Sequence, residues 1–352
     1  MDMIARELSL DPAELRRRNL LQDGDLLPDG HHLEHGRAKE TLAAALEAGD
    51  WGKPKPGPWI GRGVAMSHRH IGAGFTNARL RLERDGKVTL VIALPDTGTG
   101  AHLVLRQVVA EVLGVPIGEV SVEVATTDAF TTDSGVGGSR VTHTGGQAAY
   151  RAATALKEQV AAEAKKLTPG AALAAIAEAA AREGRTLEAA HFYEAKAGAV
   201  TCFAAQVAEV AVDPQTGQVT VRRFTTAHDV GTIINQLGHQ GQIEGGLIQG
   251  LGFALMEELQ TEEGRIGTLS LGDFKLPTVS DIPPLTTVLL EDPVGPGPFH
   301  AKAIGEGSIS PVAPAIANAV ADACGVRVMD LPITAEKVYF ALKQLGGKET
   351  RS

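Results

Sequence analysis

Apolar and polar residues alternate between positions 78 and 94 in a pattern typical of a β-hairpin. Asp85-Gly86 supplies the residue types that a two-residue hairpin turn prefers. The pattern then predicts a helix over residues 101–113, ended by Gly114, and a strand over residues 120–125. This part of the chain therefore predicts a mixture of strands and helices.

A second hairpin is predicted over residues 206–226, with its turn at residues 213–217. Each hairpin is followed by Asp-x-Gly-Thr, at residues 96–99 and 229–232. This echo indicates a duplicated supersecondary unit whose loops meet across a cleft, and chance repetition is the equal alternative. We expect an α+β fold with two related subdomains of β-hairpins, mixed sheet and packed helices.

Alanine-rich segments predict structural helices over residues 148–166 and 171–182, separated by Pro169-Gly170. Shorter helices are expected within residues 2–21 and 41–48. The expected organisation is a helical N-terminal segment and connector over residues 1–58, a first subdomain over 59–200, a second over 201–346 and a tail over 347–352.

Composition narrows the class of protein. With 43% apolar and 21% charged residues the chain is expected to be globular, and its net charge of -9 argues against a nucleic-acid partner. Cys202 and Cys324 are the only cysteines, which are too few for an iron–sulfur or cysteine-based zinc site. The sequence has no apolar run of membrane-spanning length and no N-terminal signal pattern, so we expect a soluble, cytoplasmic protein.

One carboxylate, Glu306, stands between two glycines, of which Gly305 is the first. A helix is expected directly afterwards, with Ser310 as N-cap, Pro311 at its first position and Gly325 at its left-handed exit. Because glycines leave room for a ligand, Glu306 is a candidate general base. An acidic residue that merely favours the positive end of the helix dipole is the equal alternative.

The loop over residues 131–146 combines five glycines with several hydroxyl side chains and Arg140, and a helix is expected to begin near Gln147. Loop amides, hydroxyls, a helix N-terminus and a guanidinium together predict an anion site. The competing interpretation is a flexible surface loop. The candidate contacts are Gly138, Ser139, Arg140 and Thr142.

Residues 241–256 predict a helix in spite of their glycines, each of which costs about 1 kcal/mol of helix propensity. Gln242 and Gln249 share a face from which side-chain amides could bond a flat heterocyclic cofactor. The alternative, given equal weight, is close helix packing through two glycine pairs, Gly241/Gly245 and Gly246/Gly250.

Other motifs are weaker. Gly98-Thr99-Gly100 follows a strand, but Leu103 replaces the third glycine of a dinucleotide-binding turn, so a Rossmann fold is rejected. No nucleoside-triphosphate P-loop occurs, and His68-Arg69-His70 lacks nearby residues that would complete a metal site.

In this order, the segments resemble the C-terminal half of the molybdopterin-binding large subunit in the xanthine dehydrogenase and aldehyde oxidase family, the molybdenum hydroxylases. The resemblance covers nearly the whole chain and is carried by residues 96–114, 135–148, 229–252 and 301–338. It implies a molybdenum-dependent oxidoreductase in which Glu306 is the base that deprotonates a molybdenum-bound hydroxide.

The resemblance also implies the cofactor, a molybdopterin-type molybdenum cofactor, with its cytosine dinucleotide as one form. The residues that would line or hold its site are Gly98, Thr99, Gly100, Gly138, Ser139, Arg140, Thr142, Gln242 and Gly305.

Partners follow from the same resemblance. The family places further cofactor and substrate segments upstream of the residues that match Met1, so we expect the upstream half of the molybdenum subunit on another chain. An iron–sulfur subunit with [2Fe-2S], with or without a flavin subunit carrying FAD, would accept the electrons. The expected substrate is a small aldehyde or N-heterocycle that gains a water-derived oxygen. A noncatalytic truncated remnant, or an assembly or binding subunit that keeps the fold, is the alternative.

Overall fold

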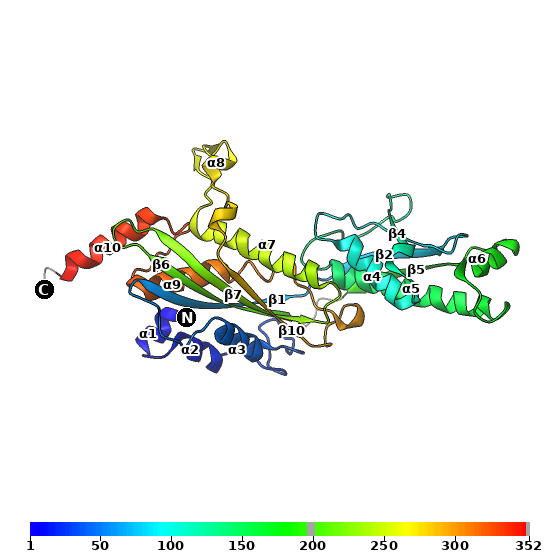
Figure 1. The fold of residues 1–352 in the computed structure, drawn as a ribbon, viewed down its shortest axis with the longest axis horizontal. Helices are drawn as coiled ribbons and strands as arrows, with labels where there is room; N and C mark the ends of the chain where they lie inside the picture. The colour runs from blue at the N-terminus through cyan, green and yellow to red at the C-terminus, as the bar shows by residue number, and fades with distance from the viewer. Residues whose placement is uncertain (196–200, 350–352) are drawn as a thin grey trace.

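The computed structural model describes residues 1–195 and 201–349, and two four-stranded sheets organise it (Figure 1). The first sheet has the order β4-β3-β2-β5, from β2 (Gly74–Leu82), β3 (Val88–Ile92), β4 (Val120–Val124) and β5 (Glu188–Ala195). The second has the order β1-β6-β7-β10, from β1 (Ile60–His70), β6 (Thr201–Val212), β7 (Val219–Gly231) and β10 (Leu285–Glu291).

The structure also describes ten helices. They are α1 (Asp2–Glu7), α2 (Pro12–Arg18), α3 (Ala38–Ala48), α4 (Ala101–Leu113), α5 (Val141–Ala164), α6 (Leu173–Arg182), α7 (Gln236–Leu255), α8 (Leu271–Phe274), α9 (Val312–Cys324) and α10 (Ala335–Glu349). Short elements complete the described chain: β8 (Thr261–Glu262), β9 (Arg265–Ile266), and the 3-10 turns η1 (Ile117–Glu119), η2 (Val279–Asp281) and η3 (Pro298–His300).

Both sheets repeat one connectivity: an antiparallel hairpin, a helix, a strand parallel to the second hairpin strand, and another helix. The first unit runs β2-β3-α4-β4-α5 and the second runs β6-β7-α7-β10-α9. The α+β fold of two related parts is therefore confirmed. The edge strands enter differently, because β5 follows its unit while β1 precedes the whole first sheet and pairs with β6. The boundaries expected at residues 58, 200 and 346 stay a prediction.

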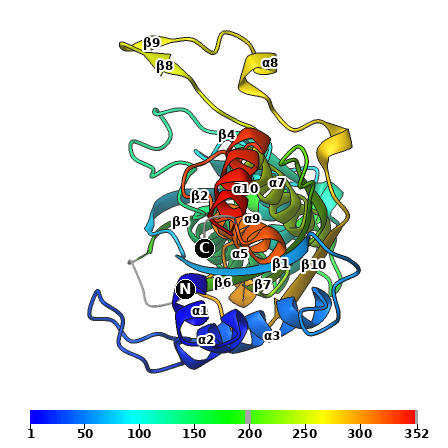
Figure 2. The same ribbon diagram turned by 90° about the vertical axis from the view of Figure 1, so that its left-hand side faces the viewer.

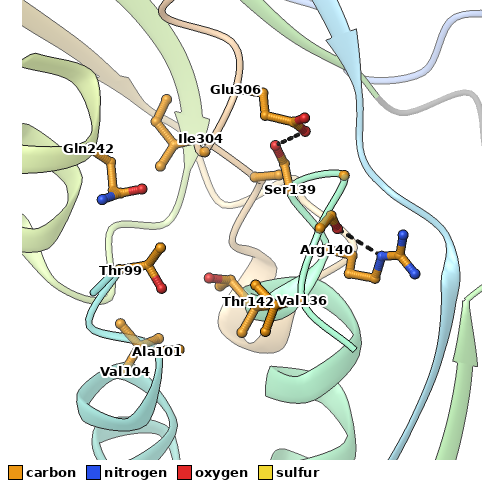
Figure 3. Close-up of a pocket in the computed structure, with 15 residues that line it drawn as sticks. Thr99, Ala101, Val104, Val136, Ser139, Arg140, Thr142, Gln242, Ile304 and Glu306 are labelled. Carbon is orange, nitrogen blue, oxygen red and sulfur yellow. Dashed lines mark hydrogen bonds between the residues drawn. The ribbon is translucent and has the colours of Figure 1, made fainter. Parts of the chain in front are cut away.

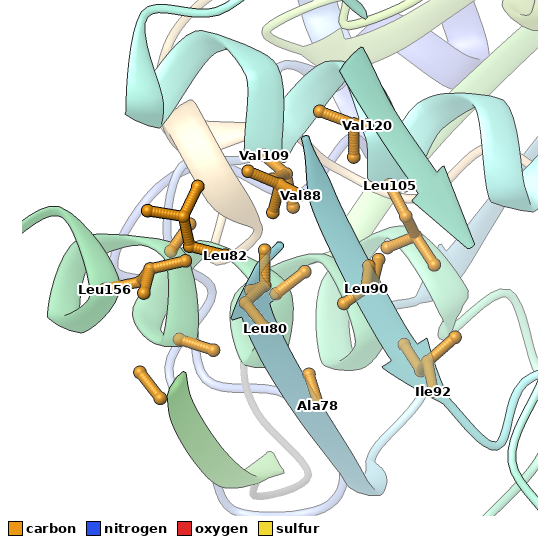
Figure 4. Close-up of a cluster of buried hydrophobic side chains, with 14 of the residues drawn as sticks. Ala78, Leu80, Leu82, Val88, Leu90, Ile92, Leu105, Val109, Val120 and Leu156 are labelled. Carbon is orange, nitrogen blue, oxygen red and sulfur yellow. The ribbon is translucent and has the colours of Figure 1, made fainter. Parts of the chain in front are cut away.

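Each sheet has its own apolar core. In the first, Leu80 and Leu90 of the hairpin pack with Leu105 of α4 and Leu156 of α5 (Figure 4). The second core joins leucines of α7 to apolar residues of α9 and to Phe224 of β7. Burial of these side chains contributes about 25 cal/mol per Å² of apolar surface.

Helix α9 lies unusually close to β1 because β1 carries glycine where the two cross. A Cβ atom at Gly61 or Gly63 would lie 2.1 Å from the backbone oxygen of Ala319 or Ala315, respectively. This contact fixes the start of α9, and with it the segment that carries Glu306.

Two predicted helix starts are wrong. Helix α5 begins at Val141 and not near Gln147, so the irregular loop is shorter than expected. Its early glycines lowered the predicted helix propensity, but packing requires them: a Cβ at Gly145 would lie 2.5 Å from Leu94 Cδ1. Helix α9 has Pro311 as N-cap without a side-chain cap bond, so Ser310 is not its cap.

The predicted end of α9 is confirmed, since Gly325 is its left-handed C-cap with φ 74°. No helix in the described ranges is both long and apolar enough to cross a membrane.

A long excursion between α7 and β10 stands away from the body of the molecule, and we call residues 257–282 the arm. It carries β8, β9 and α8 and is drawn in yellow in Figures 1 and 2.

Candidate active site

Four segments of the described chain converge on one cavity of about 260 Å³ between the two sheets (Figure 3). They are the turn before α4, the loop before α5, the first turns of α7 and the segment that precedes α9. The lining residues are Thr99, Ala101, Val104, residues 136–142, Gln242 and residues 303–306.

Most candidate residues line this cavity together. The structure places there Thr99, Gly138, Ser139, Arg140, Thr142, Gln242, Gly305 and Glu306. Gly98 and Gly100 flank Thr99 without lining it, and Gln249 lies exposed further along α7. Segments separated by about 200 residues thus meet, but of the two Asp-x-Gly-Thr loops only the first lines the cavity, through Thr99, and residues 229–232 do not.

The turn before α4 is held by Asp96. Its carboxylate accepts hydrogen bonds from the amides of Gly98, Gly100 and His102 at 3.0, 3.2 and 3.3 Å. Burial alone would raise the pKa of Asp96, but these bonds favour the charged form and the net effect lowers it. Because the glycine amides already donate to Asp96, this turn offers a ligand chiefly the side chain of Thr99.

The loop before α5 has the backbone of an anion cradle. Gly137 and Gly138 have φ values of 152° and 60°, and Ser139 has φ 58°, a left-handed conformation that non-glycine residues rarely adopt. No side chain caps the N-terminus of α5, so its first amides remain available beside Thr142.

Arg140 turns away from the cavity (Figure 3). Its Nε donates to Gly137 O at 2.8 Å and its Nη1 donates to Ser134 O at 3.2 Å. Two of its nitrogens therefore stabilise the loop itself. Its expected contact with a phosphate stays a prediction.

Glu306 reaches across the junction to the loop of the other sheet. Its Oε2 accepts a hydrogen bond from Ser139 Oγ at 2.7 Å and one from Arg69 Nη2 at 2.9 Å. Gly305 permits this approach, since a Cβ there would lie 3.2 Å from Ser139 Oγ. The Ser139 bond, followed by Arg69, lowers the pKa of Glu306 against the opposing effect of burial. Glu306 is thus an ionised carboxylate at neutral pH.

Arg69 is the site residue that the sequence did not reveal. The motif His68-Arg69-His70 was considered only as a metal site, and no group of three possible ligands exists among the residues described. Arg69 instead bridges Glu306 and the His70 ring, to which its Nη1 lies 3.0 Å from Nε2. A lone arginine at the end of a strand carries no spacing signal that points to a carboxylate 237 residues away.

The segment before Glu306 is anchored by a fully buried ion pair. Lys302 Nζ donates to both carboxylate oxygens of Asp229 at 2.9 and 2.7 Å, and also to His35 O at 2.7 Å. Burial raises the pKa of Asp229 although Lys302 opposes the shift. The next residue, Ala303, accepts a hydrogen bond from the Cys202 thiol, whose pKa burial raises to about 12, so the thiol keeps its proton.

Two observations suit the cavity to an anionic cofactor. A Cβ at Gly137 would meet open space, so the backbone of the loop before α5 is accessible there. Helix α5 offers uncapped amides, and the donors Thr99, Thr142 and Gln242 surround the same space. The carboxylate at the rim belongs to Glu306. These residues fit a molybdopterin.

Glycine-lined backbone, helix amides and hydroxyls between two related sheets define a cofactor-binding protein. The profile of the molybdopterin cofactor-binding domain family matches residues 38–283, and the chain belongs to this family. The resemblance found in the sequence is therefore confirmed.

Three proteins are similar to this chain along nearly its whole length. The chain is 32% identical to the aldehyde oxidoreductase molybdenum-binding subunit PaoC of Escherichia coli K12, over 96% of this chain and 49% of PaoC. CO dehydrogenase from Oligotropha carboxidovorans has TM-score 0.86 at 25% identity, over 99% of this chain and 50% of that one. Aldehyde oxidoreductase from Desulfovibrio gigas has TM-score 0.82 at 30% identity, over 97% and 40%. The chain spans about half the length of the relatives it matches.

Proposed function

We propose that this chain is the cofactor-binding, Glu306-bearing part of a molybdenum hydroxylase that oxidises a small aldehyde or N-heterocycle with a water-derived oxygen. An upstream half of the molybdenum subunit, on another chain, would complete the site. The observation that carries the proposal is the meeting of Glu306, the loop before α5 and Gln242 on one cavity. Membership of the family and the names of the relatives support it.

The cofactor, when bound, supplies the two-electron oxidation. The amides at the start of α5, with Thr142, Thr99 and Gln242, would hold its polar groups, in the plain or the cytosine dinucleotide form. Gly98 and Gly100 would shape the neighbouring turn, while Gly138 would let backbone approach the ligand.

Glu306 can act as a general base because its carboxylate is unprotonated at neutral pH. Its Oε2 is engaged by Ser139 and Arg69, so we assign proton uptake to Oε1. The same two donors fix the orientation of the carboxylate. Electrons would leave to a [2Fe-2S] subunit, with or without a subunit that carries FAD, in a cytoplasmic complex.

The experiment is co-expression of this chain with the polypeptide encoded beside it that aligns with the remaining half of PaoC, in cells that make the cofactor. Purified complex should contain molybdenum and oxidise an aldehyde or N-heterocycle from a panel. Glu306→Gln should lower kcat by at least about a thousandfold with molybdenum content unchanged, since it removes the base. Glu178→Gln, an exposed carboxylate of α6, is the matched control and should leave both unchanged.

A noncatalytic binding or assembly subunit is the second candidate. It is favoured by the carboxylate of Glu306 bonding to Ser139 and Arg69, because stabilising a carboxylate weakens it as a base. A complex that contains molybdenum but oxidises no panel member, with or without Glu306→Gln, would support a noncatalytic subunit over the hydroxylase.

A further inference from the structure

The arm carries several large apolar side chains that are exposed to solvent. From residue 258 to residue 282, all but Thr268, Phe274 and Pro277 are exposed. Val279 is 87% exposed and Leu269 is 84% exposed. The other exposed large apolar residues of the arm are Leu259, Ile266, Leu271, Leu276 and Ile282. Clustered apolar exposure of this kind marks an interaction surface.

The arm keeps its shape through its own hydrogen bonds. Ser270 caps α8 through the amide of Asp273 at 3.2 Å, and Thr278 and Asp281 form a capping box around η2. Glu258 N donates to Phe274 O at 3.4 Å, which ties the start of the arm to the end of α8. Within the ranges described, the hydrogen bonds of residues 258–282 are all internal. The apolar side chains are thus presented on an ordered segment that the body does not cover (Figure 2).

The charge of the arm selects the kind of partner. Residues 257–282 carry six acidic and two basic side chains, so the apolar residues stand in an acidic frame. A second copy of the chain would bring two acidic arms together, and like charges across an interface are unfavourable. A surface with an apolar centre and lysines or arginines at its rim is complementary.

We propose that the arm is the docking element for the upstream half of the molybdenum subunit, and that this half presents an apolar trough with a basic rim. The inference rests on the proposed function, which supplies that partner. It is supported by length, because the relatives contain about as much chain again as this one spans. The arm leaves from the C-terminal end of α7, the same helix whose N-terminal turns line the cavity.

The test compares binding of purified upstream polypeptide to three forms of the full-length chain by isothermal titration. They are the wild type, the double variant Leu269→Asp/Val279→Asp, and Leu26→Asp as control. Leu26 is 64% exposed and lies outside the arm. The double variant should bind on the order of 100-fold more weakly, since it replaces two central apolar contacts by charged side chains. Leu26→Asp should bind like the wild type, and all three should share one Tm, because these side chains face solvent.

Each outcome decides between explanations. Equal binding by the double variant would overturn the docking inference and leave the proposed function standing. No binding by the wild type would also overturn it, as would sedimentation showing a wild-type dimer that the double variant cannot form. Loss of binding only in the double variant, with a wild-type complex that lacks molybdenum and activity, would support the arm and refute the proposed function.

Discussion

At the scale of single residues, the pKa of Glu306 depends on two donors from other elements. Ser139 comes from the loop before α5 and Arg69 from β1, and both bonds reach Oε2. Each stabilises the carboxylate, so each lowers its pKa. The structure therefore couples the charge of the candidate base to the junction of the two sheets.

Replacing Ser139 by alanine should raise the pKa of Glu306, because the largest stabilising contact is lost. In the active complex, the acid limb of the pH–rate profile should then move to higher pH. Thr168→Ala, at an exposed hydroxyl outside the site and the arm, should not move it. If Ser139→Ala does not move the acid limb, Glu306 is not the group whose titration sets it.

The lowered pKa of Glu306 should also affect how the stability of the protein depends on pH. A carboxyl whose folded pKa is lowered stabilises the protein above its unfolded pKa and loses this contribution as pH falls through the folded value. Between the usual Glu pKa of 4.5 and the lowered value, the wild type should therefore lose stability more steeply than Ser139→Ala. Urea unfolding at a series of acidic pH values measures this, and parallel curves would contradict it.

Breaking the buried ion pair of Lys302 and Asp229 should lower the free energy of unfolding strongly. Lys302→Met leaves the Asp229 carboxylate buried without its cation, which should cost about 3–5 kcal/mol of unfolding free energy. The double variant Lys302→Met/Asp229→Leu should recover most of the loss, since no lone charge remains. Lys39→Met, at an exposed lysine of α3, is the control in urea titrations. A loss in Lys302→Met no larger than in Lys39→Met would contradict the role of the pair.

At the scale of elements, α7 uses its two glycine pairs differently. A Cβ at Gly246 would lie 2.1 Å from Ser308 Oγ, and one at Gly250 would lie 2.6 Å from Val312 Cβ. At Gly241 and Gly245 a Cβ would meet open space. Close packing thus explains the second pair and leaves the first pair, on the same helix as Gln242, facing open space.

The same substitution in one helix should therefore have opposite signs. Gly250→Ala should destabilise by about 1–3 kcal/mol through overpacking against Val312. Gly245→Ala should stabilise by up to about 1 kcal/mol, because alanine is the better helix former and nothing obstructs it. Denaturant midpoints of both variants measure the contrast, and equal destabilisation would show that Gly245 also packs against the chain.

The sequence predicted elements best where local signals agree. The hairpin at Asp85-Gly86, helix α4 and the end of α9 at Gly325 were predicted correctly because turn, periodicity and cap coincide there. The start of α5 was not, since the reason for Gly145 is the side chain of Leu94, which local propensity does not register. The sequence did not predict the exposed arm either, because leucines in a sequence are expected in the core and only the fold shows that these are exposed.

At the scale of the whole molecule, the site belongs to neither sheet alone. Ser139 extends from the first unit and Glu306 from the second, and their bond spans 167 positions in sequence. The family resemblance predicted that Glu306, Ser139 and Gln242 share one site, whereas the second Asp-x-Gly-Thr, residues 229–232, does not line it. It could not predict Arg69 or the Lys302 anchor, because both depend on long-range contacts without a periodic pattern.

Because the two apolar cores are distinct clusters, the sheets should unfold as separable cooperative units. Polar contacts that join them include Asn235 Nδ2 to Gln107 Oε1 at 2.9 Å and Gln147 Nε2 to Pro296 O at 2.8 Å. Leu90→Ala should cost about 2–5 kcal/mol and reduce amide-exchange protection in β2–β5, while Leu247→Ala should do so in β6–β10. Equal loss of protection in both sheets for either variant would show one cooperative unit. If the units are separable, opening either sheet breaks the bond between Ser139 and Glu306. The pKa of Glu306 should then rise in those molecules of each variant in which a sheet is open.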